Sequence, residues 1–151
     1  MSFWSSFRIG ASALTAQRLR LDVIANNIAN AETTRTEDGG PYQRKDVVFQ
    51  AKDAENPFPS FLVSNSGMLP YMQSGEGGVE VASIIEDDTP GERVYDPTHP
   101  DADEEGYVTY PNVNIVIEMT NMLSATRSYE ANLAALDSAK TMALKALEIG
   151  R

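Results

Sequence analysis

The stretch FRIGASALTAQRLRLDVIANNI, residues 7–28, decides the fold of this chain. Large apolar side chains recur in it every seven residues: Phe7, Leu14, Leu21 and Ile28. This spacing places them on one face of an α-helix and is typical of a coiled-coil seam, with Ile24 and Ala31 at complementary positions. We therefore expect a helix over residues 2–32 that buries one apolar face against another helix.

A second helical pattern fills the C-terminal end of the chain. Its apolar residues recur at three- and four-residue steps: Met119, Met122, Tyr129, Leu133, Leu136, Ala143 and Leu147. We expect a helix that is capped by Asn112 or Asn114 and ends near Ile149. Because the two helices stand at opposite ends of the sequence, they must either pair with each other as a coiled coil or bind helices on other copies.

The segment between the helices is acidic, rich in Pro and Gly, and without helical spacing. Short strands are expected at residues 42–49, 79–85 and 93–95, and residues 107–110 look extended. The strands at 79–85 and 93–95 should pair as a hairpin. The two prolines within residues 56–60 break any helix there.

These patterns predict a fold that is mainly α with a small β insert (α+β). Residues 1–34 and 111–151 would supply the two helices of an inner helical domain. Residues 35–110 would form a short β-rich or irregular middle region.

Three asparagines near the end of the first helix allow two interpretations. Asn26, Asn27 and Asn30 are poor helix-interior residues, because the side-chain amide competes for backbone hydrogen bonds. In one interpretation the helix ends here, and the asparagines cap it or form turns. In the other, the small Ala25 and Ala29 let a neighbouring helix approach closely, and the amides fix its register.

Composition excludes several classes of function. The chain has 12 Lys and Arg against 22 Asp and Glu, so its net charge of −10 argues against nucleic acid or an anionic membrane as partner. It has no Cys, which excludes disulfides, a thiol nucleophile and a zinc–thiolate site. No apolar run is long enough for a transmembrane helix, and Arg8 interrupts any signal-peptide core at the N-terminus.

Two features of the acidic segment bear on catalysis and metal binding. His99 is the one histidine, and no second convergent group accompanies it, so we predict no catalytic residue. Asp101, Asp103 and Glu105 have the spacing of the start of a calcium loop, but position 12 of that loop is Asn112 where a bidentate Glu is needed. A solvated acidic turn is the favoured interpretation, and we predict no metal site, cofactor or small-molecule substrate.

Several segments resemble those of the flagellar axial proteins, which are the rod, hook and hook-associated proteins. The segments are LDVIANNIANAET (residues 21–33), VYDPTHPDAD (94–103), GYVTYPNVN (106–114) and SATRSYEAN (124–132), with Glu118 and Met119 preceding the last. The first segment is typical of the whole superfamily. The others narrow the resemblance to the rod proteins, and among them to those of the proximal rod.

The resemblance implies a structural subunit and no enzyme. Such proteins pair their terminal helices in an inner coiled-coil domain and polymerise into the axial drive shaft, which transmits torque and encloses the export channel. They leave the cell through the flagellar type III export apparatus, without cleavage of a signal peptide, and assemble in the periplasm. The implied partners are copies of the same chain, other proximal and distal rod proteins, and the protein that joins the rod to the MS ring.

We expect the subunit interface to use the two apolar stripes and the asparagine motif. The residues are Phe7, Leu14, Leu21, Ile24, Asn26, Asn27, Ile28, Asn30, Met119, Met122, Tyr129, Asn132, Leu133, Leu136 and Leu147. Two alternatives stay open at this point: a coiled-coil adaptor that does not polymerise, and a calcium-dependent binding module that uses the loop at residues 101–106.

Overall fold

Two long helices dominate the computed structural model, which describes residues 3–37, 39–52 and 77–149. Helix α1 spans Phe3–Ala29 and helix α3 spans Ile115–Ile149. The strands are β1 (Lys45–Lys52), β2 (Gly78–Glu86), β3 (Arg93–Tyr95) and β4 (Tyr107–Thr109). The mainly α fold with a small β insert is therefore confirmed.

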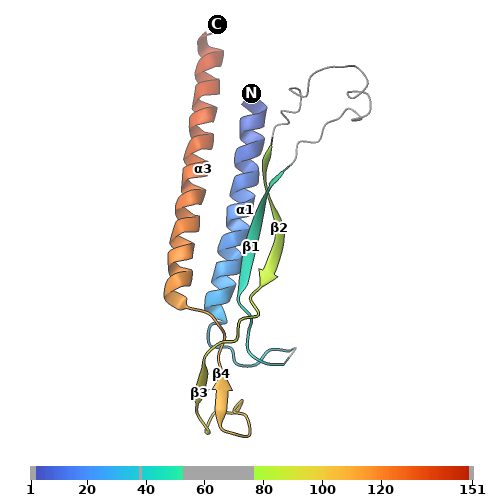
Figure 1. Ribbon diagram of the computed structural model, residues 1–151. Coiled ribbons are helices and arrows are strands. Elements are labelled where there is room, and N and C mark those ends of the chain that lie inside the picture. The colour runs from blue at the N-terminus through green and yellow to red at the C-terminus, as the bar shows by residue number, and fades with distance from the viewer. Residues whose placement is uncertain (1–2, 38, 53–76, 150–151) are drawn as a thin grey trace, which may run out of the picture.

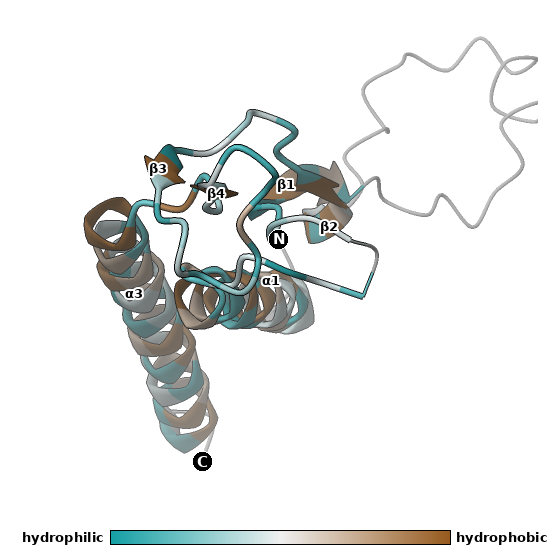
Figure 2. Cartoon of the chain, turned by 90° about the horizontal axis from the view of Figure 1, so that it is seen from below, coloured by the Kyte–Doolittle hydropathy of each residue, from teal (hydrophilic) through white to brown (hydrophobic). Residues whose placement is uncertain are grey.

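The elements form three layers. Helices α1 and α3 run antiparallel and pack against each other, and the β1–β2 ribbon covers the other side of α1 (Figures 1 and 2). The β3–β4 hairpin lies below the lower end of the helix pair (Figure 1). At about 1.5 Å per residue, α1 is roughly 40 Å long and α3 roughly 52 Å, so α3 projects past the beginning of α1.

One side of α3 forms a regular contact seam. Eight residues, spaced alternately by four and three positions, are buried or half-buried: Glu118, Met122, Ala125, Tyr129, Asn132, Leu136, Ala139 and Ala143. Near the middle of the seam Ala125 is 0% exposed. Near its C-terminal end Leu136 faces Gly10 of α1, where an added Cβ would lie 2.6 Å from Leu136 Cδ2. Glycine at position 10 thus lets the bulky Leu136 fit against α1.

The core is small for a chain of this length. Its buried apolar residues among those described are Ala16, Val23, Ile24, Val108 and Ala125. Many large apolar side chains on α3 and the strands remain exposed instead. An elongated three-layer arrangement of this kind cannot enclose all its apolar surface.

The strand pairing differs from the predicted hairpin. Strand β2 pairs antiparallel with β1, with Lys45 opposite Glu86, and a bulge follows Val48. Strand β3 pairs with β4, with Val94 opposite Val108. The prediction that residues 79–85 pair with 93–95 is therefore wrong. The reason is long-range: β1 is fixed to the end of α1, and its eight residues offer β2 a longer ladder than the three residues of β3.

The start of α3 matches the prediction, while the start of α1 at Phe3 and the end of α3 at Ile149 stand at the limits of the described residues. Asn114 caps α3, since its Oδ1 accepts hydrogen bonds from the backbone N–H groups of Val116 (3.0 Å) and Ile117 (3.1 Å). Helix α1 ends at Ala29, three residues before the predicted end. Ser5 and Ser6 lie inside α1, while Ser2 and residues 56–60 fall outside the described part of the chain.

The sequence predicts no transmembrane helix, and this prediction concerns both long helices. Neither one, over the residues described, has a stretch that is long and apolar enough to cross a bilayer.

Candidate assembly surface

Asn27 joins the end of α1 to the start of β1. The side chain is 0% exposed. Its Nδ2 donates to the carbonyl of Lys45 (2.8 Å), and its Oδ1 accepts from the backbone N–H of Lys45 (2.9 Å) and from the Tyr42 hydroxyl (3.0 Å). A fourth bond runs from Nδ2 to Glu118 Oε2 (3.1 Å). All four hydrogen-bonding positions of the amide are therefore used.

Glu118 joins the start of α3 to the same point. It is 1% exposed, and its Oε1 accepts from Arg44 Nε at 3.0 Å and from Asn121 Nδ2 at 3.3 Å. Arg44 is 21% exposed and also lies 3.6 Å from Asp46. The buried carboxylate is thus paired and hydrogen-bonded, as a buried charge must be. We call Asn27, Tyr42, Arg44 and Glu118 the polar hub.

The electrostatics of the hub reflect its burial. Burial alone would lower the pKa of Arg44, but the hydrogen bond to Glu118 and the charge of that carboxylate outweigh it, so the pKa is raised. Burial raises the pKa of the Tyr42 hydroxyl, which favours the neutral form that donates to Asn27. Both groups therefore keep the protonation state in which they can donate.

The asparagine motif shows features of both interpretations offered by the sequence, but Ala25 and Ala29, which the second interpretation placed against a neighbouring helix, are exposed. Asn30 Nδ2 donates to the carbonyl of Asn26 (3.0 Å), and the hydroxyl of Thr33 donates to Asn30 Oδ1 (3.2 Å), which is the pattern of a helix end. Asn27 makes the cross-element bonds of the second interpretation, and they reach β1 and α3 of its own chain. Contact of these asparagines with another subunit stays a prediction.

Most residues of the two predicted stripes lie between layers of the same chain. Ile24 is buried, and these are half-buried: Phe7, Leu14, Leu21, Ile28, Met122, Tyr129, Asn132 and Leu136. They are therefore available for a subunit interface only in part.

Three predicted residues stand apart, on an open face of α3. Met119, Leu133 and Leu147 are 58%, 45% and 72% exposed. They are spaced by 14 residues. Met119 and Leu133 directly follow the seam positions Glu118 and Asn132, and Leu147 continues the same spacing beyond the last seam residue, so the three form a stripe beside the seam. We call these three residues the outer stripe.

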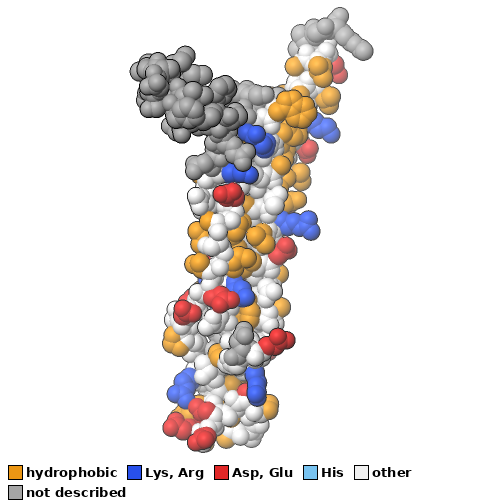
Figure 3. All heavy atoms as spheres, turned by 90° about the vertical axis from the view of Figure 1, so that its right-hand side faces the viewer, with side chains coloured by type: hydrophobic (Ala, Val, Ile, Leu, Met, Phe, Trp, Pro, Cys, Tyr) orange, Lys and Arg blue, Asp and Glu red, His pale blue; other side chains and the backbone are white. Residues whose placement is uncertain are grey.

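Further apolar residues, outside the predicted interface set, are exposed elsewhere on the chain. On α3 they are Ile115, Val116, Ile117, Leu123, Met142 and Leu144, and on α1 Trp4 is 77% exposed. Hydrophobic side chains also show on the face that carries the ribbon (Figure 3), where Val48, Ile84 and Ile85 are exposed. The sequence does contain a sign of these exposed residues, because apolar residues occur on more than one side of the C-terminal helix. Exposed apolar surface on this scale is typical of protein–protein interfaces.

Two of the three carboxylates named in the calcium interpretation bind other groups of the chain. Asp101 Oδ2 accepts from the Thr34 hydroxyl (2.8 Å), while Asp103 Oδ2 accepts from Arg93 (2.7 Å). The backbone N–H of Tyr107 donates to Asp103 and lowers the pKa of its carboxyl. Within the described part of the chain, no three His, Cys, Asp or Glu side chains lie together in a group that could hold a metal ion.

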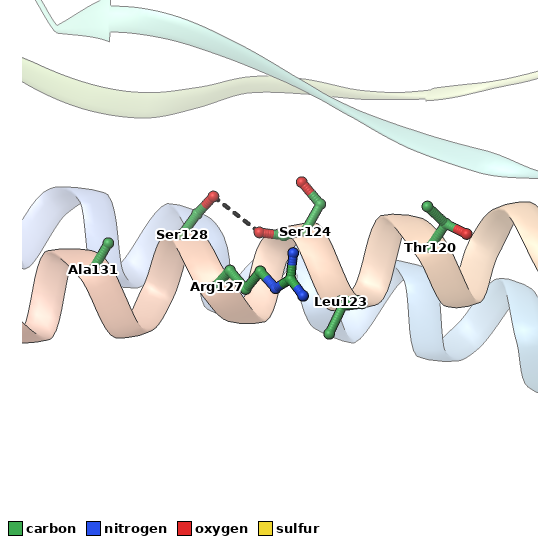
Figure 4. Close-up of a pocket in the computed structure, with 6 residues that line it drawn as sticks. All are labelled: Thr120, Leu123, Ser124, Arg127, Ser128 and Ala131. Atoms are coloured by element: carbon green, nitrogen blue, oxygen red, sulfur yellow. Dashed lines mark hydrogen bonds between the residues drawn. The ribbon is translucent and has the colours of Figure 1, made fainter.

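The surface of α3 also carries a shallow pocket (Figure 4). Its lining residues all belong to that one helix: Thr120, Leu123, Ser124, Arg127, Ser128 and Ala131. The Ser128 hydroxyl already donates to the carbonyl of Ser124 at 2.9 Å. The hollow therefore lies on the open surface of one helix.

Comparison with protein families defines the class. Residues 7–35 match the family described as "Flagella basal body rod protein". Residues 104–149 match the family described as "Flagellar basal body rod FlgEFG protein C-terminal". These matches cover most of α1, strand β4 and α3, and they point to the flagellar rod proteins as the class.

Full-length relatives then identify the particular family. The chain is 48% identical to the flagellar basal-body rod protein FlgC of Borreliella burgdorferi, over 99% of this chain and 98% of the relative. It is 48% identical to FlgC of Bacillus subtilis and 43% identical to FlgC of Escherichia coli O157:H7, each over 100% of both chains. The chain belongs to the FlgC family of flagellar basal-body rod proteins. It is therefore a structural component of the flagellar basal body that assembles with other rod components, and not an enzyme.

Proposed function

We propose that this chain polymerises in the proximal rod through its terminal helices, as part of the shaft that transmits torque and encloses the export channel. The observation that carries the proposal is the apolar outer stripe on α3, which a helix of a neighbouring subunit would cover. A contact between different faces of identical or similar subunits generates a helical assembly when its rotation does not close a ring.

The seam of α3 supports the finer proposal that α1 and α3 pair as a coiled coil. Its alternating steps of four and three residues are those of a heptad repeat. In this arrangement residues 1–34 and 111–151 make the inner helical domain, and residues 35–110 make the insert. The predicted interface residues then divide into those that hold the pair together and those that meet other subunits.

The marginal core supports a further part of the proposal, which concerns export. A chain with few fully buried apolar residues unfolds readily and gains stability when it assembles. We infer passage through the flagellar type III apparatus in an unfolded state, without signal cleavage, and assembly in the periplasm. The absence of Cys agrees with assembly in an oxidising compartment. The proposed partners are its own copies, proximal and distal rod proteins, and the protein joining the rod to the MS ring.

Deletion of the gene in its own bacterium tests this function. Cells without the chain should lack assembled rods and should not swim, and a tagged copy of the chain should restore both and co-purify with isolated basal bodies. The purified chain should form extended assemblies at high concentration. A discrete oligomer of fixed size, together with normal rods in the deletion strain, would instead favour a coiled-coil adaptor.

A further inference from the structure

The apolar contacts between α1 and α3 repeat along both helices, so they do not by themselves define one alignment of the two helices. The apolar positions of both helices recur every seven residues, and seven residues correspond to about 10 Å along a helix. If α3 moved by seven residues, Gly10 would face the small Ala143 in place of Leu136, and Asn27 would face Ala125 in place of Glu118. Apolar packing alone would therefore tolerate the shifted alignment.

The polar hub removes this ambiguity. In the observed alignment Glu118 accepts from Arg44 Nε and from Asn27 Nδ2, and Asn27 is itself fixed to the backbone of Lys45 at both its polar atoms. A shift of seven residues would part Glu118 from both donors. It would also leave the Asn27 amide facing an alanine methyl group. Buried polar groups without partners are costly, and a single buried polar contact is a known means of fixing the register of paired helices.

We propose that Glu118, with Asn27 and Arg44, selects the register of α3 against α1. This selection is the main role of Glu118. Glu118 acts as a positioning residue inside the chain. The register determines how far α3 projects past Phe3, and so it places Leu144 and Leu147 at the end of the helix pair. The consequence for assembly rests on the proposed function, whereas the register itself does not.

Distance measurements between spin labels on the two helices test the proposal. The chain has no native Cys, so Ala25→Cys in α1 and Thr141→Cys in α3, both at exposed positions, give one labelled pair. The parent chain should show one distance. The variant R44M/E118M, in which apolar side chains replace the ion pair, should keep its helical circular dichroism and show a second distance that is shorter by several ångströms, since a seven-residue slip is about 10 Å.

Two further variants sharpen the test: a matched control and a variant that moves the carboxylate to another position of the seam. R127M/E130M makes the same two replacements at exposed positions of α3 and should keep the single distance. E118M/A125E moves the carboxylate seven residues along the seam, and the register should follow it, so that one shorter distance replaces the original.

Two results would overturn the proposal. One is an R44M/E118M chain that keeps the parent distance, because the hub would then not select the register. The other is an R44M/E118M chain that loses its helical signal, because the hub would then supply stability in place of specificity. If E118M/A125E alone unfolds, the result for R44M/E118M decides whether the proposal holds. In each case the rod-assembly test above is independent, because it does not use these variants.

Discussion

Replacing Glu118 with alanine alone is expected to lower the free energy of unfolding by about 3 kcal/mol. This substitution leaves Arg44 without its carboxylate and Asn27 Nδ2 without one acceptor, and it opens a small cavity between the layers. The value lies at the lower end of the range for breaking a buried ion pair because Arg44 is 21% exposed and can regain some hydration. Urea unfolding followed by circular dichroism measures it.

The control for this prediction is Glu130→Ala, which removes an exposed glutamate from the same helix. Its effect should stay within about 0.5 kcal/mol, as for most surface substitutions. Equal, small effects of both substitutions would show that Glu118 is not held in a buried pair. The single substitution E118A differs from R44M/E118M, which removes both charged partners together and avoids an unpaired arginine.

The second large effect concerns assembly. The variant L133E/L147E places two carboxylates on the outer stripe, where the side chains are 45% and 72% exposed in the single chain. The free energy of unfolding of the monomer should change by about 0.5 kcal/mol or less per site, because neither side chain is in the core. Assembly should be lost, because burying unpaired carboxylates against an apolar helix is costly. Swimming in soft agar and the yield of rods in isolated basal bodies measure the loss.

The matched control for the outer stripe is S138E/T141E. These two residues are exposed on the polar side of the same helix, and each hydroxyl bonds only its own helix backbone in the contacts observed. The control should assemble and swim nearly as well as the parent. Equal loss in both variants would mean that added charge on α3, and not the apolar stripe, prevents assembly.

The sequence was sufficient to predict the helices and the general division of the fold. Heptad spacing from Phe7 to Ile28 and the Asn114 cap place the helices, because both signals are local. The strand at residues 79–85 was also predictable from its alternation. Its partner was not, because the choice between residues 45–52 and 93–95 depends on Asn27 fixing β1 beside α1, which is a contact between distant segments.

The candidate site was predictable only in part, for a related reason. Steps of three and four residues identify apolar positions, but they do not show which side of α3 meets α1. Met122 and Leu136 turn toward the seam, while Met119 and Leu133 turn outward. The hub could not be predicted, because Asn27, Arg44 and Glu118 meet only in the folded chain. Glu118 in particular reads as an ordinary surface residue in the first turn of a helix.

Amide hydrogen exchange, measured on the purified chain and on the same chain in isolated basal bodies, tests the central claim most directly. If the terminal helices carry the assembly, protection over residues 3–29 and 115–149 should rise by about 100-fold or more in the basal body, which corresponds to about 2.7 kcal/mol of added stability. Equal protection of both helices in the free chain and in the basal body would contradict the account, because a self-contained helix pair would gain nothing from assembly.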